Sequence, residues 1–415
     1  MRQSLLFTKT RKDAPKDEIA KNAQLLIRAG FVHKEIAGVY SFLPLGLRVM
    51  NKIVGIIREE MNSIGGQELS LTALQDKKIW ETSGRWDDSV VDVWFKTKLK
   101  NNSELGLAFT HEEPLTNLVS EYVRSFRDLP VYVYQFQTKF RNETRAKSGI
   151  MRTREFLMKD LYSFSKNENE HIIFYEKAKN AYVNIFNKVG LGDKTYITFA
   201  SGGSFSKYSH EFQTITDAGE DNIFVCKDKN IAINKEVLNE EVLNDLGLKK
   251  EDLIEKKSVE VGNIFSLGTK FSDAFELNYS DESGTKKPVI MGSYGIGPAR
   301  IMGTVAEVLS DEKGLVWPDS IAPFSIHLLL LGDGNAKVEC DNIYEKLLKS
   351  NIDVLYDDRD MRAGEKFADS DLIGIPMRVV VSEKTLQSKS VEIKYRNSDK
   401  VEIMEISEFQ KKFLK

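Results

Sequence analysis

The sequence predicts an α/β protein in two parts: a longer part that mixes helices with antiparallel strands, and a shorter C-terminal α/β part. Three observations lead to this prediction. The chain has 415 residues, and at roughly 150 residues per domain this length predicts two or three domains. Strand-like segments separated by turns dominate residues 91–162. Beyond residue 322 strands and helices alternate, which is typical of a three-layer domain with a largely parallel sheet.

The composition excludes several classes of protein. With 41% hydrophobic and 29% charged residues, wholesale disorder is excluded. The net charge of −3 argues against a charge-driven nucleic-acid binder, although a local basic patch is compatible with it. Two distant cysteines, Cys226 and Cys340, exclude a disulfide scaffold and a zinc site built on Cys-x-x-Cys pairs. Because the sequence contains neither a long apolar run nor a secretory signal, we expect a cytoplasmic protein without a membrane span.

Periodic apolar residues predict the helices. The first runs through residues 45–66 and should end at Gly65 and Gly66 in a left-handed cap. Its apolar stripe consists of Leu47, Met50, Val54, Ile57 and Met61. A second helix is expected over residues 168–189, with Ile172, Tyr175, Ala178, Ala181, Tyr182 and Ile185 facing inward. Residues 234–257 are charged and predict a short, largely helical insertion at the surface.

Residues 131–162 predict an antiparallel hairpin with an eight-residue loop. Alternation along each strand gathers mainly polar residues on one face. The polar set of the first strand is Gln135, Gln137, Lys139, Arg141 and Glu143, and that of the second strand is Arg152, Arg154, Phe156, Met158, Asp160 and Tyr162. Such charge can simply be the solvated face of a sheet. Alternatively it forms a nucleotide site, in which arginines hold phosphates, Phe156 stacks on a base and Glu143 accepts from an exocyclic amine.

Two shorter motifs carry further candidates. In VIMGSYGIGPARIMGTVAEVL a strand leads through a glycine-rich turn into a helix, with Pro298 at its first position. Arg300 in the first turn opposes the helix dipole, which suggests that it serves a ligand. Thr110-His-Glu-Glu113 follows a strand, and a carboxylate there can hold an ammonium group. The simpler interpretation is a capping box formed by Thr110 and Glu113.

In this order the motifs resemble the class II aminoacyl-tRNA synthetases, and among them the bacterial prolyl type. LPLGLRVMNKIVGIIREEMNSIGGQEL resembles motif 1 of the class, KFRNETRAKSGIMRTREFLMKDLYSF resembles motif 2, and MGSYGIGPARIMGTVAEV resembles motif 3. Segments typical of the prolyl type are GGSFSKYSHEF, FSLGTKFSDAF, WPDSIAPF and YDDRDMRAGEKFADSDLIGIP. The resemblance implies an antiparallel class II catalytic domain over residues 1–322 and an anticodon-binding α/β domain over residues 323–415.

The resemblance also implies the activity. Such an enzyme attaches L-proline to tRNA(Pro) in two steps, through a prolyl-adenylate and with release of pyrophosphate, using ATP and Mg²⁺ and no zinc. It implies a homodimer formed through motif 1. Three alternatives stay open at this point. One is another class II synthetase, such as a threonyl, glycyl or histidyl enzyme, the second is a non-catalytic paralogue, and the third is a structural or interaction protein that has only the fold.

The resemblance assigns roles to individual residues. The ATP site would comprise Arg141, Glu143, Arg152, Phe156, Glu260, Ser293 and Arg300. The proline site would comprise Thr110, Glu112, Arg141, Met158, Asp160, Tyr162 and Phe265. Among these, Arg141, Arg152 and Arg300 would act in catalysis, and Glu260 would lie near the magnesium ion that ATP carries. Arg145 and Lys147 would contact the acceptor end of the tRNA.

The chain departs from the family pattern in several places. Thr72 stands where motif 1 normally carries proline, and Ser293 replaces a common cysteine. Asn263 replaces a common histidine. Many bacterial relatives insert a large editing domain between motifs 2 and 3, whereas residues 234–257 are too few for an independent domain. We therefore expect that alanine is misactivated and that any editing of alanyl-tRNA is done by a separate protein.

Overall fold

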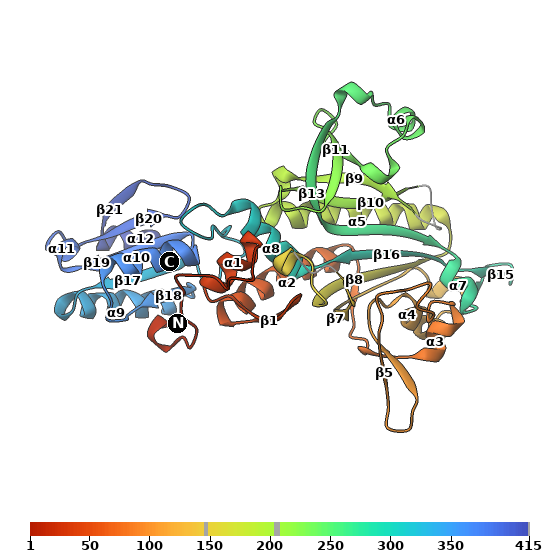
Figure 1. Cartoon of the computed structure of the whole chain (residues 1–415), viewed down its shortest axis with the longest axis horizontal. Helices are drawn as coiled ribbons and strands as arrows, with labels where there is room; N and C mark the ends of the chain where they lie inside the picture. Colours follow the sequence, from red (N-terminus) through yellow and green to blue (C-terminus); the bar gives the residue numbers. More distant parts are fainter. Residues whose placement is uncertain (145–147, 203–207, 414–415) are drawn as a thin grey trace. The chain divides into compact units, whose positions relative to one another are not determined.

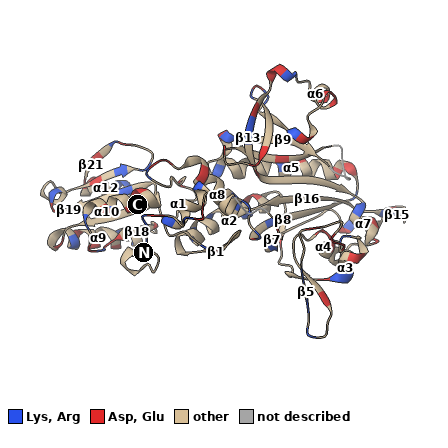
Figure 2. Cartoon of the chain, in the orientation of Figure 1, with Lys and Arg blue, Asp and Glu red and all other residues tan. Residues whose placement is uncertain are grey.

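The computed structural model describes residues 1–144, 148–202 and 208–413 (Figure 1). Its residues divide into two compact units. We call residues 36–39 and 53–304 the central unit, and residues 1–35, 40–52 and 305–415 the terminal unit. Figure 2 shows basic and acidic residues interspersed along the elements of both units, as the nearly balanced composition predicts. In the residues that the structure describes, no helix combines the length and apolar character needed to cross a membrane.

The central unit is built on one large sheet, which has nine strands in the described residues. Their order is β10-β9-β12-β11-β13-β16-β8-β7-β3. Neighbours are antiparallel except for β3 with β7 and β12 with β9. The bounds are β3 Gln67–Glu68, β7 Val131–Phe140, β8 Glu155–Ser165, β9 Thr195–Ser201, β10 Tyr208–Ile215, β11 Asp221–Cys226, β12 Ile231–Asn234, β13 Ile254–Gly268 and β16 Ile290–Ile296.

The predicted hairpin is confirmed, with a longer connection than expected. β7 and β8 pair antiparallel, with Gln135 opposite Asp160 and Lys139 opposite Phe156, so the two polar sets share one face. The strands end earlier than predicted, and the connection runs from Arg141 to Arg154. Arg141, Glu143, Arg152 and Arg154 therefore lie beyond the paired strands, so strand alternation does not decide where their side chains point.

Helix α5 (Glu168–Lys188) covers the opposite face of the sheet. Phe174 and Tyr175 contact the ring of Tyr294 on β16, at centroid distances of 5.5 and 6.1 Å. Tyr182 lies so close to β13 that a Cβ added at Gly262 would come within 3.2 Å of its ring. The helix predicted over residues 168–189 is thus confirmed, but its inward stripe was wrong at Ile172, which is 56% exposed at the solvent edge of the helix.

A smaller sheet with order β4-β6-β5 lies beside helix α3. Trp80, Trp94 and Phe109 form its buried core, with centroid distances between 4.4 and 4.9 Å. The bounds here are β4 Leu74–Asp76, α3 Lys77–Thr82, β5 Phe95–Lys98, β6 Glu104–Leu107, α4 Glu112–Val119, α7 Lys270–Ala274, β14 Asn278–Ser280 and β15 Lys286–Pro288. The carboxyl end of β6 leads directly into the segment that precedes α4, which belongs to the site described below.

The charged segment 234–257 is helical only in part. It contains one α-helix, α6 (Glu240–Leu246), between the 3₁₀ turns η5 (Lys235–Val237) and η6 (Lys250–Asp252), and its last residues already belong to β13. Figure 1 shows α6 and the adjoining ends of β11 and β13 projecting from the large sheet. Val242 and Leu243 anchor the projection on Cys226 and Ile233 in a small core of its own.

The first long helix, α2 (Pro44–Ser63), is confirmed, and Gly65 adopts the predicted left-handed conformation with φ of +92°. Met50, Val54, Ile57 and Met61 are buried as expected, whereas the prediction was wrong at Leu47, which is 49% exposed. The buried leucine of the first turn is instead Leu45, at 1% exposed.

The terminal unit contains the predicted alternation of strands and helices. Its sheet has the order β18-β17-β19-β20-β21, in which β17, β18 and β19 are parallel and the last two strands are antiparallel. The bounds are η1 Gln3–Leu5, α1 Lys21–Arg28, β1 Val32–Ile36, β2 Val39–Phe42, α8 Pro298–Leu309, β17 Ile326–Leu331, α9 Gly334–Lys349, β18 Val354–Asp357, α10 Ala363–Ile373, β19 Met377–Ser382, α11 Glu383–Gln387, β20 Ser390–Tyr395, β21 Val401–Glu405 and α12 Ile406–Phe413. Helix α8 begins in the central unit and ends in the terminal unit.

The first residues of the chain bind the C-terminal sheet of the same unit. Arg2 forms ion pairs with Asp341 at 2.8 Å and Asp358 at 3.1 Å, and its guanidinium lies over the ring of Tyr356. Buried His327 on β17 is within 2.9 Å of Gln3. These contacts explain why the unit is discontinuous in sequence.

We predict that shortening a side chain on the buried face of α5 lowers the free energy of unfolding far more than shortening one on its exposed face. Ile185→Ala removes a fully buried side chain and should lower the free energy of unfolding by about 2–5 kcal/mol. Ile172→Ala, the matched exposed position on the same helix, should change it by less than about 0.5 kcal/mol. Urea unfolding followed by circular dichroism measures both, and equal losses would contradict the assigned orientation of α5.

Candidate active site

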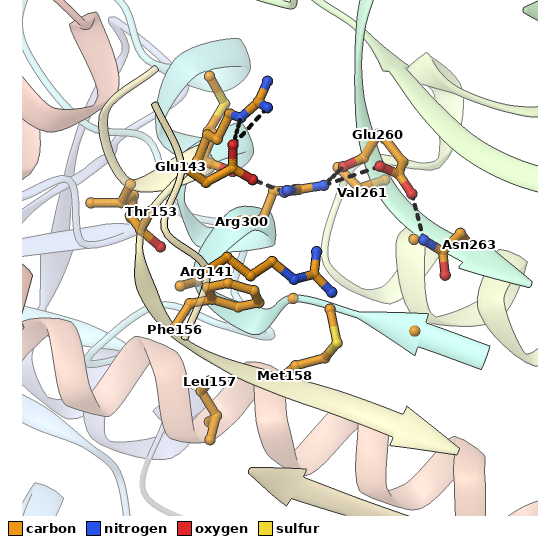
Figure 3. Close-up of a pocket in the computed structure, with 17 residues that line it drawn as sticks. Arg141, Glu143, Thr153, Phe156, Leu157, Met158, Glu260, Val261, Asn263 and Arg300 are labelled. Carbon is orange, nitrogen blue, oxygen red and sulfur yellow. Dashed lines mark hydrogen bonds and ion pairs between the residues drawn. The ribbon is translucent and has the colours of Figure 1, made fainter. Parts of the chain in front are cut away.

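A pocket opens on the face of the large sheet opposite α5, between the β7–β8 connection, β13 and the start of α8 (Figure 3). It lies entirely in the central unit. The sequence-predicted residues that line it are Arg141, Glu143, Arg152, Phe156, Met158, Glu260 and Arg300. Antiparallel pairing of the strands, together with the turn from β16 into α8, brings these separate segments to one place.

Arg141 points into this pocket with most of its donors uncommitted (Figure 3). Among the described residues its guanidinium makes only two long hydrogen bonds, both of 3.4 Å, to the carbonyl of Phe109. The ring of Phe156 lies 5.3 Å from the guanidinium carbon. Burial, and next the neighbouring charge of Arg300, lower the pKa of Arg141. A largely buried cation without a carboxylate partner is well suited to bind an anion.

Arg152 and Arg300 are held by carboxylates. Nε and Nη2 of Arg152 donate to Glu143 at 3.2 and 2.8 Å, and Nη1 donates to Glu220. Arg300 donates to the carbonyl of Met151 at 2.8 Å and to the carbonyl and carboxylate of Glu260 at 2.8 and 3.3 Å. A phosphate bound by Arg152 would therefore compete with two carboxylates for its N–H donors.

Carboxylates gather on the side of this pocket where Glu220 and Asp221 lie. Burial raises the pKa of Glu211 to about 7, with a further contribution from the neighbouring Glu260, and burial also raises the pKa of Asp221. Within residues 1–144, 148–202 and 208–413 no three His, Cys, Asp or Glu side chains converge as metal ligands. A magnesium ion here would thus take one or two carboxylates, such as Glu260, with the remaining ligands from phosphate and water.

The segment Thr110–Glu113 lies next to Ser293 of β16. Oγ1 of Thr110 donates to the Glu112 carboxylate at 2.5 Å, and the hydroxyl of Ser293 donates to its other oxygen at 3.3 Å. Ser293 was predicted among the ATP residues, but it does not line the pocket of the arginines and contacts Glu112 instead. The strand register sets Tyr162, Ser293 and Phe265 in one row on this face.

The predicted capping box was wrong. Helix α4 begins at Glu112, its N-cap residue is His111, and no side chain caps it. Glu113 is fully buried and accepts hydrogen bonds from Ser83 at 2.7 Å and from Arg85 at 2.9 and 3.1 Å. Arg85 also lies 3.7 Å from the Glu112 carboxylate. Glu113 therefore binds Ser83 and Arg85, which are distant in the sequence, and does not cap α4.

Two predicted proline-site residues lie in the interior beneath the surface of the site. Asp160 is 3% exposed and Tyr162 is 1% exposed. The Asp160 carboxylate accepts from Gln135 at 2.9 Å, Lys139 at 3.0 Å and Tyr162 at 3.1 Å. Phe265 packs on the adjacent hydrophobic core. Arg145 and Lys147, the predicted tRNA contacts, lie outside the described residues.

Sequence reasoning assigned no role to several residues of this site. Arg85, His111 and Lys139 carry its buried polar network, and Glu220 pairs with Arg152. A signal existed for Lys139, which the alternation placed among the polar residues of β7. Arg85 lies between Trp80 and Trp86 and shows no local pattern, because its partner Glu113 is 28 residues away.

We predict that Arg85→Met destabilises the central unit by about 3–5 kcal/mol, because it leaves the Glu113 carboxylate buried without its cation. Burial already raises the pKa of Glu113 to about 7. In the variant the native state should bind a proton that the unfolded state releases, so stability should fall as the pH rises from 5 to 8. Urea unfolding at both pH values measures this. Arg85→Met/Glu113→Gln should recover most of the loss, and a pH-independent loss would contradict the mechanism.

Comparisons with known proteins agree on one family. Residues 95–309 match the class II core domain of tRNA synthetases (G, H, P, S and T), and residues 320–415 match an anticodon binding domain. The proline–tRNA ligase of Agrobacterium fabrum is 35% identical over 441 aligned positions that cover 100% of both chains. That of Caulobacter vibrioides is 37% identical and covers 96% of this chain and 95% of its own.

Solved structures share the fold. A prolyl-tRNA synthetase from Cryptosporidium parvum in complex with L-proline and AMP has a TM-score of 0.76 at 19% identity, over 94% of this chain and 73% of that chain. The Giardia lamblia enzyme in complex with prolyl-adenylate has a TM-score of 0.74 at 18% identity, over 92% of this chain and 74% of that chain.

Proposed function

The chain belongs to the class II prolyl-tRNA synthetases, and from that premise we propose how its residues carry out the ligation of L-proline to tRNA(Pro). The reaction has two steps. The carboxylate of proline attacks the α-phosphorus of ATP and pyrophosphate leaves. A terminal ribose hydroxyl of the tRNA then attacks the carbonyl carbon of the prolyl-adenylate, which forms the prolyl ester and releases AMP and a proton. The observation that carries our assignment of residues is the convergence of Arg141, Arg152 and Arg300 with Phe156 in one pocket.

The first step needs positioning and charge neutralisation more than proton transfer. We assign Arg141 to the α-phosphate and the proline carboxylate, because its donors are the least committed of the three arginines. Arg152 would take the γ-phosphate, releasing a carboxylate contact as it does so. Phe156 and Arg300 would enclose the adenine ring, and Glu143 would accept from its exocyclic amine. Glu260, together with the phosphates, would hold the magnesium ion, which would neutralise further charge on the leaving group.

We assign recognition of proline to Thr110 and Glu112. The secondary ammonium of proline has two N–H donors, and it needs two acceptors. The Glu112 carboxylate offers one, and the Thr110 hydroxyl offers the other, because its own proton is donated to Glu112. Met158 lines the adjoining nucleotide pocket, while Asp160, Tyr162 and Phe265 would act from the interior and the neighbouring core.

We further propose the arrangement of the whole enzyme. We place the boundary between the catalytic and anticodon-binding domains near residue 322. The second domain would bind the anticodon of tRNA(Pro) through its unpaired bases. Arg145 and Lys147 would contact the acceptor end. By its resemblance to motif 1, residues 43–69 would form the interface of a homodimer. We propose that the reaction takes place in the cytoplasm, where translation consumes prolyl-tRNA.

The activity is tested by amino-acid-dependent exchange of pyrophosphate into ATP with Mg²⁺ and each of the twenty amino acids. Exchange should be strongest with proline and weaker with alanine. Arg141→Ala should lose roughly 2–5 kcal/mol of ligand interaction, seen as a fall in kcat/KM, while its unfolding curve stays unchanged. Strongest exchange with another amino acid would refute the substrate, and near-normal exchange in Arg141→Ala would refute the role of that arginine.

Editing is proposed to be absent from this chain. Alanine is smaller than proline, and a missing methylene gives only about 1–3 kcal/mol of discrimination. The projection between β12 and β13 holds one short helix, and the Agrobacterium relative aligns along its whole length without room for a further domain. We predict that preformed Ala-tRNA(Pro) is hydrolysed at the spontaneous rate in the presence of the purified enzyme. Faster hydrolysis would refute this, and a separate editing protein is the partner that the prediction implies.

A further inference from the structure

The segment Thr110–Glu113 is fixed by buried groups on its sheet-facing side. The carbonyl of Thr110 accepts from Gln75 at 2.9 Å, and the backbone N–H of His111 donates to the hydroxyl of Tyr162 at 3.1 Å. The His111 ring, fully buried, lies with Nε2 at 3.0 Å from the carbonyl of Thr72. A carbonyl only accepts, so Nε2 carries the proton and Nδ1 of the neutral ring is an acceptor.

Lys139 supplies the donor for that acceptor. Its ammonium is 0% exposed and lies 2.6 Å from Nδ1 of His111 and 2.9 and 3.0 Å from the two oxygens of Asp160. Burial, and next the positive charge of Lys139, lower the pKa of His111 to about 4, which keeps the ring neutral. Lys139 thus links Asp160 on β8 to the segment that carries Thr110 and Glu112.

Stability alone does not account for this arrangement. Removing an ammonium and a carboxylate from water costs several kcal/mol, and apolar residues of similar size often replace such pairs without loss. A second buried lysine of the same hairpin, Lys159, has a different set of partners. Lys159 is equally buried on the opposite face and donates to the hydroxyl of Tyr182 at 2.6 Å and the carbonyl of Tyr294 at 3.0 Å, both on the side of α5.

We propose that Lys139 is a positioning residue for the amino-acid substrate. By holding His111 against Asp160 it sets the start of α4, and with it the Thr110 hydroxyl and the Glu112 carboxylate, at the distance and angle that a secondary ammonium requires. The inference rests on the proposed recognition of proline by Thr110 and Glu112. Without the Lys139 contact the segment is free to shift on the sheet, and a displacement of about 1 Å in such a group can cost about 10²-fold in rate.

The test compares Lys139→Met with Lys159→Met in proline-dependent pyrophosphate exchange, with thermal unfolding measured on both. Both variants remove one buried ammonium from the same hairpin. Lys139→Met should raise the KM for proline about 10- to 100-fold with little change in the KM for ATP. Lys159→Met should lower the unfolding midpoint by a similar amount and leave the KM for proline near that of the unmodified enzyme.

A second pair covers the case in which Lys139→Met does not fold. His111→Asn retains an acceptor near the position of Nδ1 and should keep most of the affinity for proline, whereas His111→Leu should lose it. The proposal is overturned if proline KM is unchanged, if both KM values rise together, if Lys159→Met has the same effect, or if His111→Asn and His111→Leu behave alike. Absence of proline-dependent exchange in the unmodified enzyme would instead refute the proposed function.

Discussion

The site depends on the antiparallel register of β8, β16 and β13. In that register Tyr162, Ser293 and Phe265 form one row, and Asp160, Gly295 and Asn263 form the next. A slip by one residue would send every one of these side chains to the face covered by α5. Glycine makes the close packing of β16 possible, because a Cβ at Gly292 would lie 2.5 Å from the hydroxyl of Tyr294 and one at Gly295 would lie 2.9 Å from the side chain of Asn263.

Local patterns in the sequence were sufficient to predict much of this architecture. Alternation along residues 131–162 identified the hairpin and the face that holds Lys139 and Phe156, because both the period of two and the pairing of successive strands are local properties. The strand, glycine-rich turn and Pro298 likewise predicted that Arg300 would lie at the start of a helix. The roles of these residues came from the resemblance to a known family, which supplies chemistry that periodicity does not contain.

What the sequence did not predict are the long-range partners. The Thr110–Glu113 spacing fits a capping box, but Arg85 offers the buried Glu113 carboxylate a charged hydrogen bond that a helix N-terminus cannot match. Glu143 was assigned to a base, and in the structure its carboxylate is bound by Arg152. Leu47 and Ile172 fit helical stripes but are 49% and 56% exposed, since a stripe specifies a face and not its extent.

The discontinuity of the terminal unit affects how the protein is made on the ribosome. Arg2 leaves the exit tunnel long before its partners Asp341 and Asp358 are synthesised, and residues 53–304 of the central unit emerge in between. Domains generally fold as they emerge, N-terminal first. Here the first residues cannot form these ion pairs until the last quarter of the chain has been synthesised. A nascent chain that stalls after residue 320 therefore already contains Arg141, Arg152 and Arg300 but cannot complete the terminal unit to which Arg2 belongs.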